Sequence, residues 1–223
     1  MQKNWIPIPS PDETLVQHLA GELSIEPVVA RLLVQRGIQT FEEARSFFRP
    51  SLDDLHDPFL MRDMDRAVTR LVQALENGDK ILVYGDYDVD GTTAVTLVYS
   101  FLRDLGVTCD YYIPDRYTEG YGFSMKGVDY AHDNGCQLII TLDCGVRDGA
   151  KIDYARSKGI DVIVCDHHQP GDVLPDAIVL NPKQSDCPYP FKELSGCGVG
   201  WKLLSAYFKS KELSPDPLYR RLD

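Results

Sequence analysis

Acidic and histidine side chains follow three separate apolar runs of this chain. The clusters are Asp86, Asp88 and Asp90 after Ile81–Tyr84, Asp143 after Leu138–Leu142, and Asp166, His167 and His168 after Ile160–Cys165. Carboxylates that are crowded together repel one another, and a bound cation removes that repulsion. The clustering therefore predicts a metal site rather than three unrelated helix caps.

The ligand types indicate which metal this site would hold. Carboxylates favour Mg²⁺ or Mn²⁺, and an added imidazole tilts the choice towards Mn²⁺. Two such ions about 4 Å apart would bridge an attacking hydroxide and polarise a phosphoryl oxygen. The chemistry indicated by these residues is hydrolysis of a phosphoester.

The elements around the three clusters alternate between short β-branched runs and amphipathic helices. Strands are predicted at 81–84, 107–113, 138–142, 160–165 and 177–180, and helices at 64–77, 92–105, 124–134, 148–158 and 199–209. This alternation predicts an α/β fold, a parallel sheet with helices on both faces. Ligands of such sheets bind beyond the carboxyl ends of the strands, so the three clusters should meet at one rim.

The first 60 residues have a different pattern. They are interrupted by prolines and contain short amphipathic stretches at 27–36 and 40–48. We expect a small helical N-terminal segment at 1–60 and an α/β phosphoesterase domain at 61–223.

Composition excludes several classes of protein. No apolar run approaches the roughly 20 residues of a membrane-spanning helix, and the first residues lack a secretory signal, so a cytoplasmic protein with no membrane partner is expected. The six cysteines form no Cys-x-x-Cys pair, which favours buried free thiols. The net charge of −11 argues against a general polyanion binder, although bound metal ions would reverse the local sign.

The ordered motifs carry a family resemblance. Asp88-Val89-Asp90-Gly91, Asp143 and Asp166-His167-His168 resemble the first three motifs of the DHH phosphoesterase family. The stretches 57–67, 83–91 and 113–122 resemble its single-stranded-DNA exonuclease branch. This resemblance implies a metal-dependent 5′-to-3′ exonuclease that hydrolyses single-stranded DNA in recombination and repair, with single-strand-binding protein and a helicase as partners.

The resemblance also implies residue roles. Asp88 and Asp90 would be paired metal ligands, Asp143 would bridge two ions of Mn²⁺ or Mg²⁺, and His167 would ligate one of them. Asp143 and His168 would be the catalytic residues, with His168 facing the scissile phosphate.

Three further positions complete the expected site. Pyrophosphatase-type relatives place a histidine where this chain has Tyr84, so Asp86 is the candidate that completes the metal site. Asp166 would orient a histidine ring. Arg116 would bind substrate phosphate, unless it forms a structural ion pair with Asp115 or Glu119.

Two weaker features lie nearby. The glycine-rich run 195–202 opens a predicted helix, where backbone N–H groups either approach an anion or allow tight packing of the helix. Tyr117, Tyr121 and Phe123 either stack on bases or belong to the core.

Alternatives remain open at this point. Asp88-Val89-Asp90-Gly91-Thr92-Thr93 also matches the nucleophile motif of haloacid dehalogenase-type phosphatases, in which Asp88 would be phosphorylated. An oligoribonuclease or nucleotide phosphatase of the DHH family and a non-catalytic DNA-processing scaffold are the other candidates. The family's fourth acidic motif is not found before the sequence ends, and Asp223 lacks its context, so an N-terminal fragment with weak or no activity of its own is expected.

Overall fold

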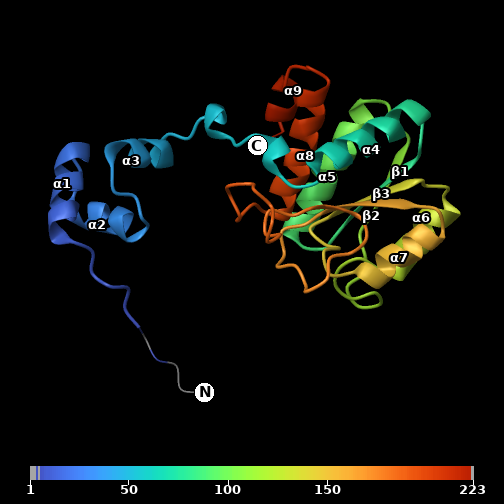
Figure 1. Cartoon of the computed structure of the whole chain (residues 1–223), viewed down its shortest axis with the longest axis horizontal. Coiled ribbons are helices and arrows are strands. Elements are labelled where there is room, and N and C mark those ends of the chain that lie inside the picture. Colours follow the sequence, from blue (N-terminus) through green and yellow to red (C-terminus); the bar gives the residue numbers. More distant parts are fainter. Residues whose placement is uncertain (1–3, 5, 222–223) are drawn as a thin grey trace. The chain divides into compact units, whose positions relative to one another are not determined.

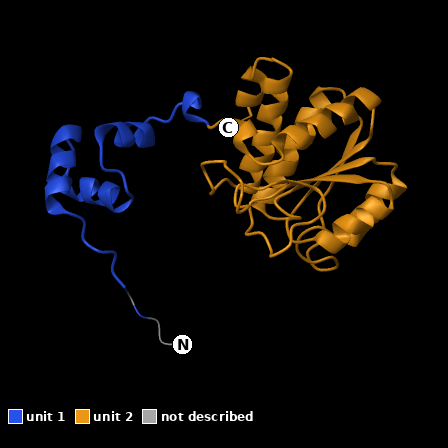
Figure 2. Cartoon of the chain, viewed as in Figure 1, with its two compact units in different colours: residues 1–55 blue, residues 56–223 orange. Residues whose placement is uncertain are grey.

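The computed structural model describes residues 4 and 6–221, and it separates the chain into two compact units, residues 1–55 and 56–223 (Figures 1 and 2). The sequence pattern predicts this boundary at residue 60. Asp223 lies outside the described residues.

The first unit consists of short helices around a small apolar core. Its elements are α1 Glu13–Leu23, α2 Pro27–Gln35, α3 Phe41–Phe48 and the 3-10 turn η1 Leu52–Asp54. Helix α1 is absent from the sequence prediction; Asp12 caps it by accepting a hydrogen bond from the backbone N–H of Thr14. Val16 and Leu19 of α1 pack against α2, so burial stabilises both helices.

The second unit is built on a five-stranded sheet in which every pair of neighbouring strands is parallel. The strands are β1 Ile81–Gly85, β2 Cys109–Tyr112, β3 Leu138–Leu142, β4 Asp161–Cys165 and β5 Ile178–Leu180. Their order is β2-β1-β3-β4-β5. The predicted α/β fold class is confirmed, and each predicted strand is present.

Helices cover both faces of this sheet (Figure 1). They are η2 Pro58–Leu60, α4 Met64–Asn77, α5 Val89–Asp104, α6 Met125–Asp133, α7 Gly149–Ser157, α8 Gly196–Ser210 and α9 Asp216–Tyr219. Ile81 and Val83 of β1 point into a core with α4, α5 and α8, whereas Leu82 and Tyr84 point into a second core with α6 and α7. Side chains alternate between the faces of a strand, which separates the two cores.

Helices α5 and α8 begin earlier than the predicted starts at residues 92 and 199. Asp88 caps α5 and Ser195 caps α8, each through a side chain that accepts a backbone N–H. Asp90 therefore lies in the first turn of α5, and Gly196 and Cys197 lie in the first turn of α8.

The prediction of free cysteines is confirmed. All six cysteines are free thiols, and five of them are buried. Among the described residues, no helix is both long enough and apolar enough to span a membrane.

Candidate metal centre

Three aspartates form a row at the carboxyl ends of the strands. Backbone hydrogen bonds continue one residue beyond the sheet: Asp86 N–H donates to Leu142 O at 3.4 Å, and Asp143 N–H donates to Cys165 O at 2.9 Å. Asp86, Asp143 and Asp166 therefore follow three neighbouring strands at equivalent positions, and each is 0–1% exposed. Burying three carboxyl groups this closely is costly without a cation or hydrogen-bond donors.

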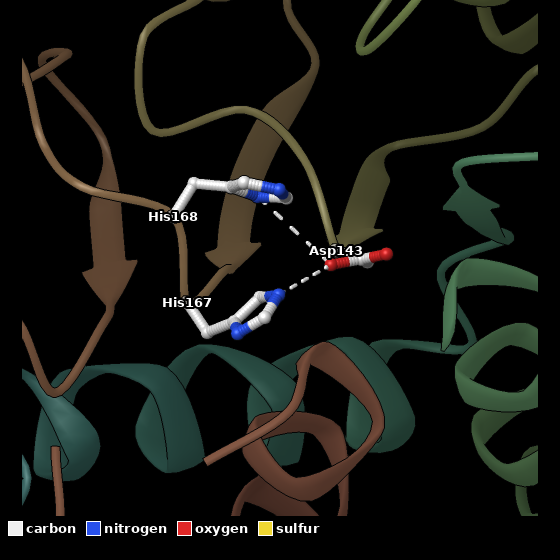
Figure 3. Close-up of side chains that lie close together, drawn as sticks. All are labelled: Asp143, His167 and His168. Carbon is white, nitrogen blue, oxygen red and sulfur yellow. Dashed lines mark ion pairs between the residues drawn. The ribbon is translucent and has the colours of Figure 1, made fainter. Parts of the chain in front are cut away.

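Asp143, His167 and His168 form the group that could hold a metal ion. Their ligand atoms lie within 4.8 Å of one another (Figure 3). Nε2 of His167 lies 3.0 Å from Oδ1 of Asp143, and this oxygen accepts no hydrogen bond from a described residue. Two neighbouring ligands of an octahedral ion with bonds of about 2.1 Å would lie about 3 Å apart, so the pair fits a shared cation.

The raised pKa of Asp143 also indicates a site for a cation. Burial, together with the charges of Asp90 and Asp88, raises the pKa of Asp143 to about 8. Without metal, this carboxyl group is therefore largely protonated at neutral pH. A divalent cation would displace the proton and neutralise the repulsion.

Asp90 lies at the same centre but is held by α8. Its two carboxylate oxygens accept hydrogen bonds from the backbone N–H groups of Gly196 and Cys197, each at 2.7 Å. Nε2 of His167 lies 3.6 Å from Asp90 Oδ2. The glycine-rich run does bind an anion, and that anion is a side chain of the same protein.

Gly196 has a second role that the sequence does not indicate. A Cβ atom at this position would lie 2.6 Å from both Cβ and Oδ1 of Asp143. The first turn of α8 thus packs directly against the buried carboxylate, and only glycine leaves room for it.

Asp86 and Asp88 lie outside the group of three. Asp88 is exposed, and its Oδ1 accepts the N–H of Gly91 at 3.0 Å. Asp86 is buried, with Oδ1 accepting a long hydrogen bond of 3.4 Å from Gly122 and Oδ2 lacking any partner among the described residues. Burial first, and the charge of Asp88 next, raise the pKa of Asp86. The metal roles assigned to both residues stay predictions.

Tyr84 belongs to the core. Its hydroxyl donates to Gly122 O at 2.8 Å, and its ring stacks on Tyr112 with centroids 5.5 Å apart. The Tyr84 hydroxyl is thus engaged with the backbone, and the buried carboxylate that follows β1 is Asp86.

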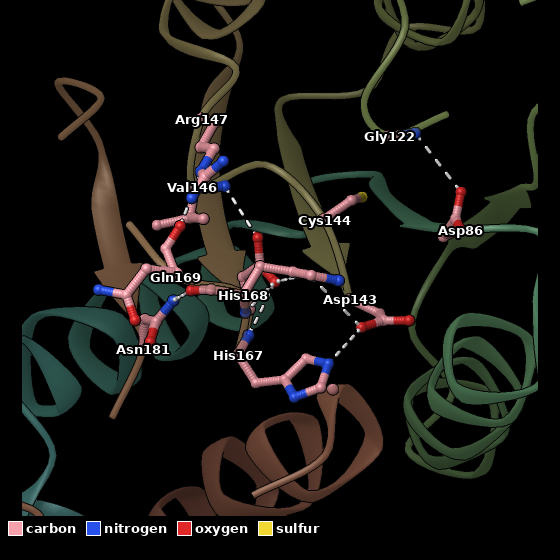
Figure 4. A network of polar contacts seen from close by, with 12 residues as sticks. Asp86, Gly122, Asp143, Cys144, Val146, Arg147, His167, His168, Gln169 and Asn181 are labelled. Atoms are coloured by element: carbon pink, nitrogen blue, oxygen red, sulfur yellow. Dashed lines mark hydrogen bonds and ion pairs between the residues drawn. The ribbon is translucent and has the colours of Figure 1, made fainter. Parts of the chain in front are cut away.

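Asp166 orients the ring of His168. Oδ1 of Asp166 lies 2.8 Å from His168 Nδ1 and also accepts the backbone N–H of His167, while Oδ2 accepts the N–H of Val146 (Figure 4). Burial alone would raise the pKa of Asp166, but these hydrogen bonds outweigh it and lower the pKa. The bond to Asp166 raises the pKa of His168.

Tyr121 holds the other side of the same ring. Its hydroxyl lies 2.8 Å from His168 Nε2, a role that the sequence does not reveal because an exposed tyrosine suggests only stacking. Both nitrogens of His168 therefore have protein partners, whereas His167 Nε2 faces only the carboxylates. This difference makes His167 the better placed metal ligand of the two.

The two remaining aromatic candidates differ in exposure. Phe123 is fully buried, so of the two alternatives it belongs to the core; its ring packs on Tyr84 with centroids 5.0 Å apart. Tyr117 is 93% exposed and remains available for stacking.

Arg116 is exposed and lies near the same rim. Its guanidinium lies 5.4 Å from the ring centroid of Tyr87. The alternative of an ion pair with Asp115 or Glu119 is not found among the described residues, because Asp115 accepts backbone N–H groups and Glu119 accepts the hydroxyl of Tyr112. The guanidinium thus has no carboxylate partner among the described residues, and its role as a phosphate contact stays a prediction.

The dehalogenase-type alternative fails on geometry. Its nucleophile stands directly at a strand end, but β1 ends at Gly85 and Asp88 serves as the cap of α5. Such a site also has no use for the histidine pair after β4.

Comparison with known proteins agrees with this site. The sequence model of the DHH family, N-terminal domain, matches residues 80–221. Curated relatives include the single-stranded-DNA-specific exonuclease RecJ of Bacillus subtilis, 44% identical over 89% of this chain and 25% of the relative. RecJ of Escherichia coli is 40% identical over 82% of this chain and 31% of the relative. The chain thus spans about a quarter to a third of their length.

Solved structures give the same result. A crystal structure of exonuclease RecJ bound to manganese has a TM-score of 0.64 and 35% identity, over 70% of this chain and 40% of that one. RecJ of Thermus thermophilus in complex with Mn²⁺ has a TM-score of 0.74 and 28% identity, over 92% of this chain and 28% of that one. With the motifs, the sheet topology and the matched region in agreement, this chain belongs to the DHH family.

Proposed function

We propose that this chain carries the metal-dependent catalytic centre of an exonuclease that hydrolyses phosphodiester bonds of single-stranded DNA. The observation that carries the proposal is the pair of Asp143 Oδ1 and His167 Nε2, 3.0 Å apart, beside a His168 ring oriented by Asp166. The similarity to single-stranded-DNA-specific exonucleases supports the substrate class. The 5′-to-3′ direction and the role in recombination and repair rest on family resemblance.

Mn²⁺ or Mg²⁺ is the proposed cofactor. Asp143 and His167 would hold it, with Asp90, Asp88 and Asp86 as further proposed ligands. When bound, such ions lower the pKa of water and polarise a phosphoryl oxygen. The RecJ structures named above contain manganese, and the orphaned oxygens of Asp143 and Asp86 suit a hard cation.

His168 is the proposed contact to the scissile phosphate. Its raised pKa favours the imidazolium form, in which Nδ1–H donates to Asp166, and Nε2–H donates to the Tyr121 oxygen in the free chain and would be shared with a phosphate oxygen when substrate binds. Tyr121 fixes the direction of Nε2. A charged donor held at both ends loses little entropy when substrate binds.

Arg116 and Tyr117 are the proposed contacts to the rest of the single-stranded DNA. A guanidinium without a carboxylate partner can bind phosphate in a bidentate manner. An exposed tyrosine can stack on a base of an unpaired strand. A single-strand-binding protein and a helicase as partners, and a cytoplasmic location, complete the proposal on resemblance alone.

Degradation of 5′-phosphorylated single-stranded DNA tests this proposal. The assay compares Mn²⁺, Mg²⁺ and chelator in this chain and in a version extended at its C-terminus to the length of the relatives. We expect metal-dependent release of mononucleotides, loss of that release in Asp143→Asn, and retention in Asp153→Asn, which changes an exposed aspartate of α7.

Three results would overturn the assignment. Full release by Asp143→Asn would refute the metal centre. Equal cleavage of short RNA would favour an oligoribonuclease. Absence of cleavage from the extended version under all conditions would favour a non-catalytic scaffold.

A further inference from the structure

A cavity of about 440 Å³ is lined by His168 but by neither Asp143 nor His167. The loop after β3, the loop after β4 and Tyr121 form its walls. His168 belongs both to this cavity and to the metal group, and in Figure 4 it lies between Arg147 and Asp143. A substrate that contacts His168 from the metal side can therefore extend into this cavity.

Arg147 is the cationic side chain of the cavity. Its Nε donates to Gln169 O at 2.7 Å, and no ion pair joins its guanidinium to a carboxylate in the described part of the chain. The adjacent Asp148 pairs instead with Lys151 at 2.6 Å. The two terminal nitrogens of Arg147 thus keep a donor edge that matches a phosphate.

Seven of the thirteen arginines form an ion pair with a carboxylate among the described residues, five of them with an aspartate. Arg66 pairs with Asp63, Arg70 with Asp79 and Asp161, and Arg62 with Asp186. An arginine left without such a partner, in a cavity beside the proposed phosphate contact, is disposed to bind an anion of the substrate.

One carboxylate, Asp166, contacts both the backbone beside Arg147 and the ring of His168. Oδ2 of Asp166 accepts the N–H of Val146 at 2.9 Å and so fixes the backbone next to Arg147. Oδ1 of the same group holds His168 Nδ1 at 2.8 Å. Gly145, at φ 109°, makes the turn between Asp143 and this anchored segment. The loop therefore holds the guanidinium in a defined place relative to the imidazole.

We propose that Arg147 binds a second phosphodiester, the one adjacent to the scissile phosphate, on the far side of His168 from the metal group. This inference rests on the proposed function, because it takes the scissile phosphate to lie at Asp143, His167 and His168. It implies a site that recognises two successive phosphates. A trinucleotide with two phosphodiesters is then a better ligand than a dinucleotide with one.

Equilibrium binding tests the inference without requiring turnover. TpT and TpTpT would compete with a short fluorescein-labelled oligothymidine for this chain, with Ca²⁺ in place of Mn²⁺. Wild type should bind TpTpT about tenfold more tightly than TpT, since a charge-assisted contact contributes on this order. Arg147→Ala should lose most of that preference, and Arg147→Lys should keep part of it.

Arg103→Ala is the matched control. It removes the same charge from an arginine that also lacks a carboxylate partner among the described residues, because Arg103 donates to the Tyr99 hydroxyl at the other end of α5. The TpTpT preference should persist in this variant. A wild type with no preference, or an Arg147→Ala variant that keeps it, would overturn the inference. Failure of the proposed nuclease function would be distinguishable, because the chain would then bind TpTpT more tightly than TpT but would not hydrolyse DNA in the cleavage assay.

Discussion

Oδ1 of Asp166 lies 2.8 Å from Nδ1 of His168 and accepts the backbone N–H of His167 at 2.7 Å. One buried oxygen thus sets the position of two consecutive histidines. The ring of His168 turns towards Tyr121, whereas the ring of His167 turns towards Asp143. The two histidines can then have different roles despite being neighbours in the sequence.

Asp166→Asn should separate catalysis from metal binding. The amide would no longer stabilise a charged His168, so the pKa of that ring should fall and turnover should drop by about 10–100-fold. Mn²⁺ affinity should change much less, because Asp143 and His167 are retained. Calorimetry and steady-state hydrolysis measure the two quantities. A loss of affinity as large as the loss of turnover would contradict this division of roles.

Tyr121→Phe removes the hydroxyl that lies 2.8 Å from His168 Nε2. One hydrogen bond contributes on the order of 1 kcal/mol, so kcat/KM should fall by about fivefold while the fold is retained. Tyr117→Phe is the control because its side chain is exposed and the hydroxyl makes no described hydrogen bond. Equal effects of the two substitutions would argue for stacking alone as the role of both tyrosines.

Metal-free protein should lose stability as the pH rises. The pKa of Asp143 is about 8 in the folded chain, above the unfolded value of about 3.9. The contribution of this group is therefore complete below pH ~4 and disappears as the pH rises through about 8. Thermal unfolding from pH 6 to 9 in chelator should show a fall in Tm that is smaller in Asp143→Asn. Added Mn²⁺ should reverse the fall, and parallel curves for wild type and variant would refute the raised pKa.

Gly196→Ala should damage the metal site with little change elsewhere. The added methyl would lie 2.6 Å from Asp143, so either α8 or the carboxylate must move. Mn²⁺ affinity should fall by at least about tenfold, because ligand positions tolerate only small displacements. Gly149→Ala, in the first turn of α7, is the matched control because its new Cβ meets nothing within 4 Å. Unchanged affinity in Gly196→Ala would remove the steric argument.

The sheet was predictable from the sequence, but the register was not. Short β-branched runs identify β3 and β4 because such residues suit a strand buried on both faces. No local pattern states that Asp86, Asp143 and Asp166 stand side by side, since that depends on which residues pair across the strands. The sequence predicts that these aspartates lie at the same edge of the sheet. Only the structure shows that they occupy equivalent positions after three neighbouring strands.

Several details of the centre depend on tertiary contacts. Glycines 91, 196 and 198 have low helix propensity, so the sequence places the starts of α5 and α8 too late. The capture of Asp90 by α8 follows from those early starts. The orientation of Asp166 likewise depends on its hydrogen bond with Val146 N–H in another loop. The two residues are far apart in the sequence, so no local motif predicts which histidine Asp166 contacts.

Gly196 serves two acidic groups at once. Its N–H reaches Asp90, and the space left by its missing side chain admits Asp143. These two carboxylates come from distant parts of the chain. Gly196, in the first turn of α8, contacts both of them and so affects how far apart they lie. A shift of α8 along its axis would therefore move the position of Asp90 and the space available to Asp143 at the same time.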